Sequence, residues 1–139
     1  MSGVMDIARL RSSFQLVVDR EPLVLERFYE VLFERHPQAR PLFGRNSRKA
    51  QAQMLTQALV SVLDKIEDAE WLTETLGAMG AKHVGYGVTD AMYDWVGDAL
   101  LVTLAEVAGD AWTPEVAADW AEAYGAIASL MKQGAARAA

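Results

Sequence analysis

The two histidines of the chain, His36 and His83, have the widest chemical scope of its side chains. His83 follows Leu76 and Met79 at helical spacing on an apolar face, where a neutral imidazole suits ligation of a haem iron or another metal. A core histidine that hydrogen-bonds a carbonyl would show the same spacing. His36 precedes Pro37 at a predicted helix end, where we expect it to cap the helix with its side chain near the negative end of the dipole.

Two other polar side chains interrupt apolar helical faces in the first half of the chain. Tyr29 lies between Phe28 and Leu32, so we expect its hydroxyl to be buried and to need a hydrogen-bond partner. Gln51 lies one turn before Leu55 on an otherwise apolar face. A tyrosine that bonds a carbonyl and a glutamine at the rim of a helix would leave the same pattern.

The segments that must position these side chains are predicted to be helices, because apolar residues recur at three- and four-residue steps. No window alternates at the strand period between turn signals. We therefore expect an all-α fold with about six helices and a short helical turn near Pro41, packed as one domain over residues 1–139. We expect residues 132–139 to form a frayed tail. The predicted helices cover residues 4–18, 22–36, 51–66, 72–83, 89–107 and 114–131.

Capping residues set the predicted ends of these helices. Asp19 with Pro22 shortly after it is expected to begin the second helix. Gly87, together with Gly85, is expected to end the helix that carries His83. Thr113 before a proline predicts the start of the final helix.

Composition excludes several classes of function. The chain has 139 residues, of which 52% are hydrophobic, and a net charge of −6 with no long basic cluster. This argues against nucleic acid or an anionic membrane as the main partner. Cysteine is absent, which excludes thiolate metal sites and disulfides. No apolar run reaches the length of a signal peptide or a membrane span, so we expect a cytoplasmic protein.

Three segments together resemble the bacterial single-domain haemoglobins and the globin domain of flavohaemoglobins. Residues 28–43 read FYEVLFERHPQARPLF, similar to the segment that joins helices B and C of that family. Lys82 and His83, followed by glycines and by Tyr93, resemble the segment from helix F to helix G. Trp120 and Tyr124 match the final helix. The resemblance covers essentially the whole chain and implies a globin fold.

The resemblance assigns roles around a haem. His83 matches the proximal ligand of the iron, and Phe43 matches the phenylalanine that stacks on the porphyrin. Tyr29 matches the distal tyrosine that faces bound dioxygen. Gln51 and Leu55 match the distal glutamine and the apolar residue one turn after it. If the gap in the alignment with the family is placed elsewhere, Gln53 and Gln57 compete for these positions.

The same resemblance implies haem b as the cofactor, held by side chains from five predicted segments. Lys82 and Tyr124 are candidates for its propionates, with a solvated lysine and a packed tyrosine as the alternatives. The implied cofactor-binding residues are Phe43, Leu55, Lys82, Val88, Tyr93, Val96 and Tyr124. In the family a tyrosine and a glutamate are linked to the proximal histidine. Tyr93 matches the tyrosine, but residues 133–136 read QGAA, without a carboxylate.

The implied function is reversible dioxygen binding at a five-coordinate ferrous haem, with nitric oxide and carbon monoxide as further ligands. Such a protein converts nitric oxide to nitrate when a reductase restores the ferrous state, and here we expect a separate, unidentified reductase. Non-enzymatic oxygen storage or delivery, or gas or redox sensing, is the alternative, with a globin that binds no haem as the third. The sequence leaves open whether the chain forms a homodimer and which electron donor it uses.

Overall fold

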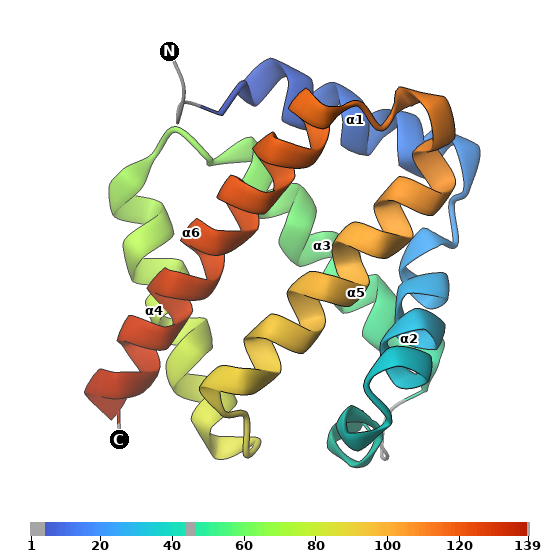
Figure 1. Cartoon of the computed structure of the whole chain (residues 1–139). Helices are drawn as coiled ribbons and strands as arrows, with labels where there is room; N and C mark the ends of the chain where they lie inside the picture. The colour runs from blue at the N-terminus through green and yellow to red at the C-terminus, as the bar shows by residue number, and fades with distance from the viewer. Residues whose placement is uncertain (1–4, 44–46, 139) are drawn as a thin grey trace.

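The chain folds into a bundle of α-helices, shown in Figure 1. The computed structural model describes residues 5–43 and 47–138, and this part of the chain holds six α-helices, two short 3₁₀ helices and no strand. The all-α prediction is confirmed. The elements are α1 (Ile7–Arg20), α2 (Val24–Arg35), η1 (Pro37–Phe43), α3 (Arg48–Asp64), α4 (Ala69–Gly85), α5 (Asp90–Ala108), η2 (Gly109–Ala111) and α6 (Pro114–Ala138).

Side-chain caps fix the starts of several helices. Asp6 accepts a hydrogen bond from the backbone N–H of Arg9 at the start of α1, and Ser47 and Asp68 do the same for α3 and α4. These caps satisfy backbone donors that have no partner inside the helix. At the other end of α4, Gly87 has a φ of +83°, a left-handed conformation that favours glycine and lets the chain turn into α5.

Several predicted helix starts are wrong, including that at Leu72, since α4 begins at Ala69 after the Asp68 cap. Asp19 does not begin the second helix, because α1 continues through Arg20 and the Asp19 carboxylate accepts a hydrogen bond from the Gln15 side chain one turn earlier. The third helix starts at Arg48 rather than at Gln51, because the Ser47 cap extends it into the polar stretch. Val4, the first residue of the first predicted helix, lies outside the described residues.

The predicted frayed tail is not what the structure contains. Helix α6 continues to Ala138, and Gly134 within it is buried. A Cβ atom on Gly134 would lie 2.0 Å from the carbonyl oxygen of Gly77 on α4. The glycine is therefore part of a close helix–helix contact, which periodicity counted on apolar side chains could not show. Ala139 lies outside the described part of the chain.

The helices divide into two groups, as Figure 1 shows. Helix α4 lies along α6, the most extensive helix pair, while α2 packs on α5, α3 and η1. The buried apolar side chains form two clusters that follow this division. The larger cluster centres on α1, α2 and α5, and the smaller one joins α4 and α6 through Leu76 and Met131. Tyr124 packs against both clusters.

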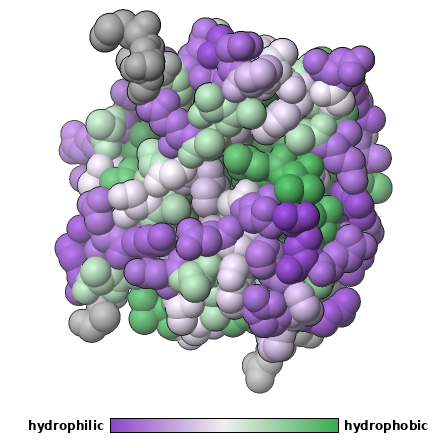
Figure 2. All heavy atoms as spheres, in the orientation of Figure 1, coloured by the Kyte–Doolittle hydropathy of each residue, from purple (hydrophilic) through white to green (hydrophobic). Residues whose placement is uncertain are grey.

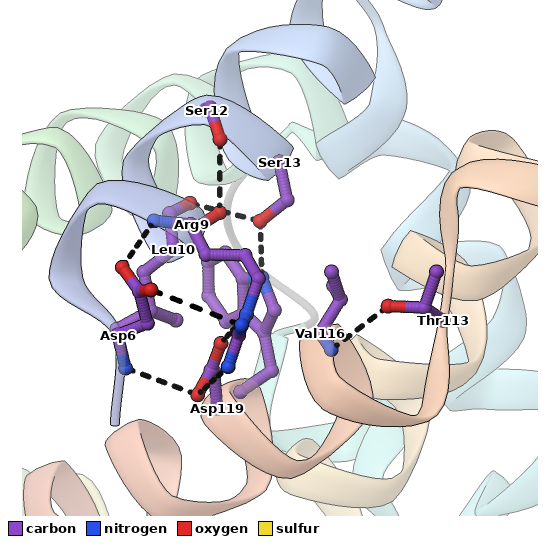
Figure 3. Close-up of polar contacts among 9 residues, drawn as sticks. Asp6, Arg9, Leu10, Ser12, Ser13, Thr113, Val116 and Asp119 are labelled. Carbon is purple, nitrogen blue, oxygen red and sulfur yellow. Dashed lines mark hydrogen bonds and ion pairs between the residues drawn. The ribbon is translucent and has the colours of Figure 1, made fainter. Parts of the chain in front are cut away.

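An ion pair and its hydrogen bonds fasten the first helix to the last (Figure 3). The carboxylate of Asp119 on α6 is 3% exposed and accepts hydrogen bonds from the Arg9 guanidinium and from the backbone N–H of Asp6. Next to it, the indole N–H of Trp120 donates to the hydroxyl of Ser13 at 2.9 Å. These contacts hold α1 across the N-terminal half of α6.

The face that presents α5 and α6 is mainly hydrophilic, with hydrophobic residues in several smaller areas of it (Figure 2). No helix in the described residues is long and apolar enough to cross a bilayer.

Candidate functional site

His83 lies in the last turn of α4, with its side chain half-buried. Its Nδ1 is 2.6 Å from the carbonyl oxygen of Met79, one turn earlier. Because a carbonyl only accepts, Nδ1 must carry the proton, and in the neutral ring Nε2 then has a free lone pair. This is the tautomer that a metal-ligating histidine needs, with the other ring nitrogen held by a hydrogen bond.

Tyr29 and Phe43 are brought together at the other group of helices. The Tyr29 ring lies 5.4 Å from that of Phe43 in an edge-on arrangement and 4.8 Å from that of Phe28, between centroids. Tyr29 is 5% exposed, and burial raises the pKa of its hydroxyl to about 12. Burial of the residue is thus observed, and its hydroxyl has no hydrogen-bond partner among the described residues, although the fully buried hydroxyl without a partner is that of Tyr93. A protonated donor with no acceptor among the described residues is suited to bind a ligand.

The candidate glutamines lie on different faces of helix α3. Gln51 is half-buried and lies one turn before Leu55, which packs against the larger apolar cluster that also contains Tyr29. Gln53 and Gln57 are exposed. A helix rotates by about 100° per residue, so Gln53 points about 200° away from Gln51. The geometry favours Gln51 as the distal glutamine, and this assignment stays a prediction.

Tyr93 and Tyr124 are joined on the α5–α6 side of the site. The Tyr124 hydroxyl donates to the backbone carbonyl of Tyr93 at 2.6 Å, so in this arrangement its proton is not available to a propionate, which only accepts. The Tyr93 hydroxyl is buried and has no partner in the described part of the chain. The ammonium of Lys132 lies 5.8 Å from the centre of the Tyr93 ring. The link from Tyr93 to His83 that the resemblance implied is therefore not formed here.

The remaining predicted residues occupy varied positions. Lys82 is exposed, while Val88 packs against the smaller cluster and Val96 against the larger one. His36 is the C-cap of α2, as expected, but its Nε2 lies 2.8 Å from a carboxylate oxygen of Asp98 on α5 instead of facing the helix end alone.

Two groups contact His83: a carbonyl, which the sequence offered as the alternative role, and Tyr86, which sequence reasoning did not name. The Met79 carbonyl holds the ring, and the aromatic ring of Tyr86 lies against it with centroids 5.5 Å apart. Tyr86 follows His83 by three residues, a spacing that places side chains on neighbouring parts of a helix surface, and this could have indicated the contact. Two surface cavities, of about 460 Å³ beside Lys132 and about 290 Å³ beside Arg11, lie outside the predicted site, although Tyr124 borders the first.

Fold and site together define an all-helical protein in which a candidate ligand histidine lies on α4, while a buried tyrosine with no hydrogen-bond partner among the described residues lies in the larger apolar cluster. Comparison with known proteins identifies the family. The globin family profile matches residues 26–131, and the chain belongs to the globin family.

The similar proteins are flavohaemoproteins. The flavohemoprotein of Rhizobium meliloti (strain 1021) is 34% identical over 110 residues, 78% of this chain and 27% of the relative. That of Xylella fastidiosa (strain Temecula1) is 33% identical over 128 residues, 91% of this chain and 32% of the relative. The chain thus spans about a third or less of these relatives. A solved flavohemoglobin from Malassezia yamatoensis, with bound FAD and heme, has a TM-score of 0.74 at 23% identity, covering 94% of this chain and 36% of that one. This last likeness concerns the fold.

Proposed function

We propose that this globin binds haem b through His83, binds dioxygen reversibly at the ferrous iron, and converts nitric oxide to nitrate when a separate reductase supplies electrons. The observation that carries the proposal is the imidazole of His83, whose Nδ1–H is held 2.6 Å from the Met79 carbonyl and whose Nε2 is left free. Haem-containing flavohaemoglobin relatives support the choice of cofactor.

The residues present fit a bound haem. The buried Tyr29 hydroxyl keeps its proton at neutral pH, because burial raises its pKa to about 12. It is available as a donor to a ligand, since no described residue accepts its proton. Phe43 lies beside it and supplies an aromatic face. When bound, the haem supplies an iron that takes up dioxygen and exchanges single electrons.

The tyrosine would favour a ligand that carries partial negative charge. A hydrogen bond to a charged group is worth about 1.5–3 kcal/mol, so dioxygen would gain more from Tyr29 than the less polar carbon monoxide. Gln51 would add a second donor from α3. Oxidation of nitric oxide then follows the balance of one NO, one O₂ and one electron to one nitrate. The electron must come from the reductase.

The first test is the optical spectrum of the purified chain in the ferric state, after reduction by dithionite, and after exposure to carbon monoxide and dioxygen. A Soret band and a reduced form that binds both gases are expected. His83→Ala should lose high-affinity haem, and His36→Ala is the matched control that should keep it. Haem-free protein that refuses added hemin would contradict the proposal.

The second test separates the enzyme from an oxygen store. With a surrogate reductase, the oxygenated protein should consume nitric oxide in a catalytic cycle and release nitrate. Consumption that stops after one equivalent per haem, while the reductase remains active, would instead favour oxygen storage or delivery.

A further inference from the structure

The C-terminal turn of α4 places a second aromatic ring against His83. Tyr86 is the C-cap residue of α4 and lies three residues after the histidine. The ring centroids of His83 and Tyr86 are 5.5 Å apart, with an interplanar angle of 63°. Edge-on aromatic pairs at this separation attract each other. Tyr86 is 65% exposed, so its contact with His83 is not a consequence of burial in the core.

The backbone of the same turn fixes the positions of His83 and Tyr86 relative to each other. The carbonyl of His83 accepts hydrogen bonds from the backbone N–H groups of Tyr86, at 3.0 Å, and of Val88, at 3.1 Å. Gly87 completes the turn with its φ of +83°. The position of Tyr86 relative to His83 is thus set within six residues of chain and does not depend on another helix.

The neighbouring helices give the imidazole no polar support among the described residues. Tyr93 on α5 has a buried hydroxyl that bonds no described residue, and residues 133–136 on α6 contain no carboxylate. The Met79 carbonyl fixes the protonated nitrogen at one point of the ring. A single hydrogen bond leaves the ring free to rock about that point, and the Tyr86 ring is a further contact on it.

We propose that Tyr86 is a positioning residue for His83, in place of the tyrosine on α5, and that its ring rather than its hydroxyl does this. The proposal rests on the proposed function in that the oriented Nε2 is the atom offered to the haem iron. The effect of Tyr86 on the orientation of His83, however, does not require bound haem.

The test compares Tyr86→Phe, Tyr86→Ala and Tyr93→Phe in the full chain. In protein prepared without haem, nitrogen NMR of the histidine side chains reports the tautomer of each imidazole ring. The chain has only two histidines, so His36→Ala assigns the signals. Haem-loaded protein gives two further readouts, the iron–histidine stretching band in resonance Raman spectra and the rate of haem loss to an excess of an acceptor globin without haem. Far-UV circular dichroism checks the fold of each variant.

Tyr86→Phe should match the wild type in all readouts, and Tyr93→Phe should match it in the His83 nitrogen signals of the haem-free protein. Tyr86→Ala should move the His83 nitrogen signals toward values averaged between tautomers, broaden the iron–histidine band and speed haem loss about threefold to tenfold, the range that one lost aromatic pair gives. Unchanged signals in Tyr86→Ala, or equal changes in Tyr93→Phe, would overturn the proposal. If the chain takes up no haem, the proposed function fails, while the NMR comparison still decides the role of Tyr86.

Discussion

Tyr29 combines a buried ring with a hydroxyl that no described residue engages. The Phe28 and Phe43 rings pack edge-on against it and fix its position on α2. Burial in apolar surroundings disfavours the phenolate, which is why its pKa rises to about 12. The residue is therefore a neutral donor over the whole pH range in which the protein would work.

Tyr29→Phe should raise the dioxygen dissociation rate of the haem-loaded protein about tenfold, the effect of one lost hydrogen bond of about 1.4 kcal/mol. Flash photolysis or stopped-flow mixing measures this rate. Between pH 6 and pH 10 the wild-type rate should show no titration of Tyr29, since the group remains protonated there. An unchanged rate in the variant would mean that the hydroxyl does not face the ligand.

At the scale of elements, the contact of α1 with α6 depends on one carboxylate. The hydrogen bond from Arg9 holds the pKa of Asp119 below its usual value, and the N–H of Asp6 adds to this effect. A carboxylate with a depressed pKa stabilises the fold above its ordinary pKa of about 4, and that stability is lost as the pH falls through the folded-state value.

Asp119→Asn should lower the free energy of unfolding by about 1–2 kcal/mol at pH 7, because charge-assisted hydrogen bonds to a buried group are lost. The difference from the wild type should shrink as the pH falls below 4 and through the lowered folded-state pKa of Asp119, where its carboxyl group becomes neutral like the asparagine amide. Urea denaturation at pH 7 and pH 3 measures both values. Asp110→Asn, at an exposed position, is the control and should change neither. An equal loss at both pH values would exclude the ionised pair as the cause.

The contact between α4 and α6 depends on glycines. A Cβ on Gly80 would lie 1.9 Å from the carbonyl oxygen of Met131, whereas one on Gly125 of α6 would meet nothing within 4 Å. Gly80 lies one turn before His83, so this contact also sets where the candidate ligand sits.

Gly80→Ala should lower the free energy of unfolding by about 1–3 kcal/mol, because the helices must move apart. Gly125→Ala should raise it by about 0.5–1 kcal/mol through the better helix propensity of alanine. Chemical denaturation of the two variants beside the wild type compares them directly. If both variants shifted stability in the same direction, the tight α4–α6 contact would not be the reason.

At the scale of the whole molecule, the candidate site draws on both groups of helices. His83 comes from the α4–α6 pair, and Tyr29, Phe43 and Leu55 come from the group around α2. Tyr124 packs against both apolar clusters. A group bound by both sides would tie the two clusters together.

Haem should therefore stabilise the folded chain. Ligand at a hundredfold excess over its dissociation constant adds about 2.7 kcal/mol to the free energy of unfolding when it binds the folded state alone. Thermal unfolding with and without haem should show a higher Tm for the loaded protein, and the increase should largely vanish in His83→Ala. A Tm that does not respond to haem would contradict a site shared by the two groups.

The sequence by itself determined the all-α class and most helix ends. Apolar residues at helical steps show which faces are buried, and glycines such as Gly87 mark ends through local backbone preferences. The resemblance also indicated His83, Tyr29 and Phe43 as a set. Asp19 misled the prediction because a capping residue type is equally compatible with a helix interior when a neighbour such as Gln15 bonds its side chain.

Only the tertiary structure decided what these residues touch. The buried Gly134, the Tyr93 hydroxyl that has no partner among the described residues, and the Asp119 ion pair all depend on how helices far apart in sequence pack together. Periodicity says which side of a helix is apolar, but not the distance or the rotation at which two helices meet. That distance follows from how backbone and side-chain surfaces fit once the whole bundle has packed.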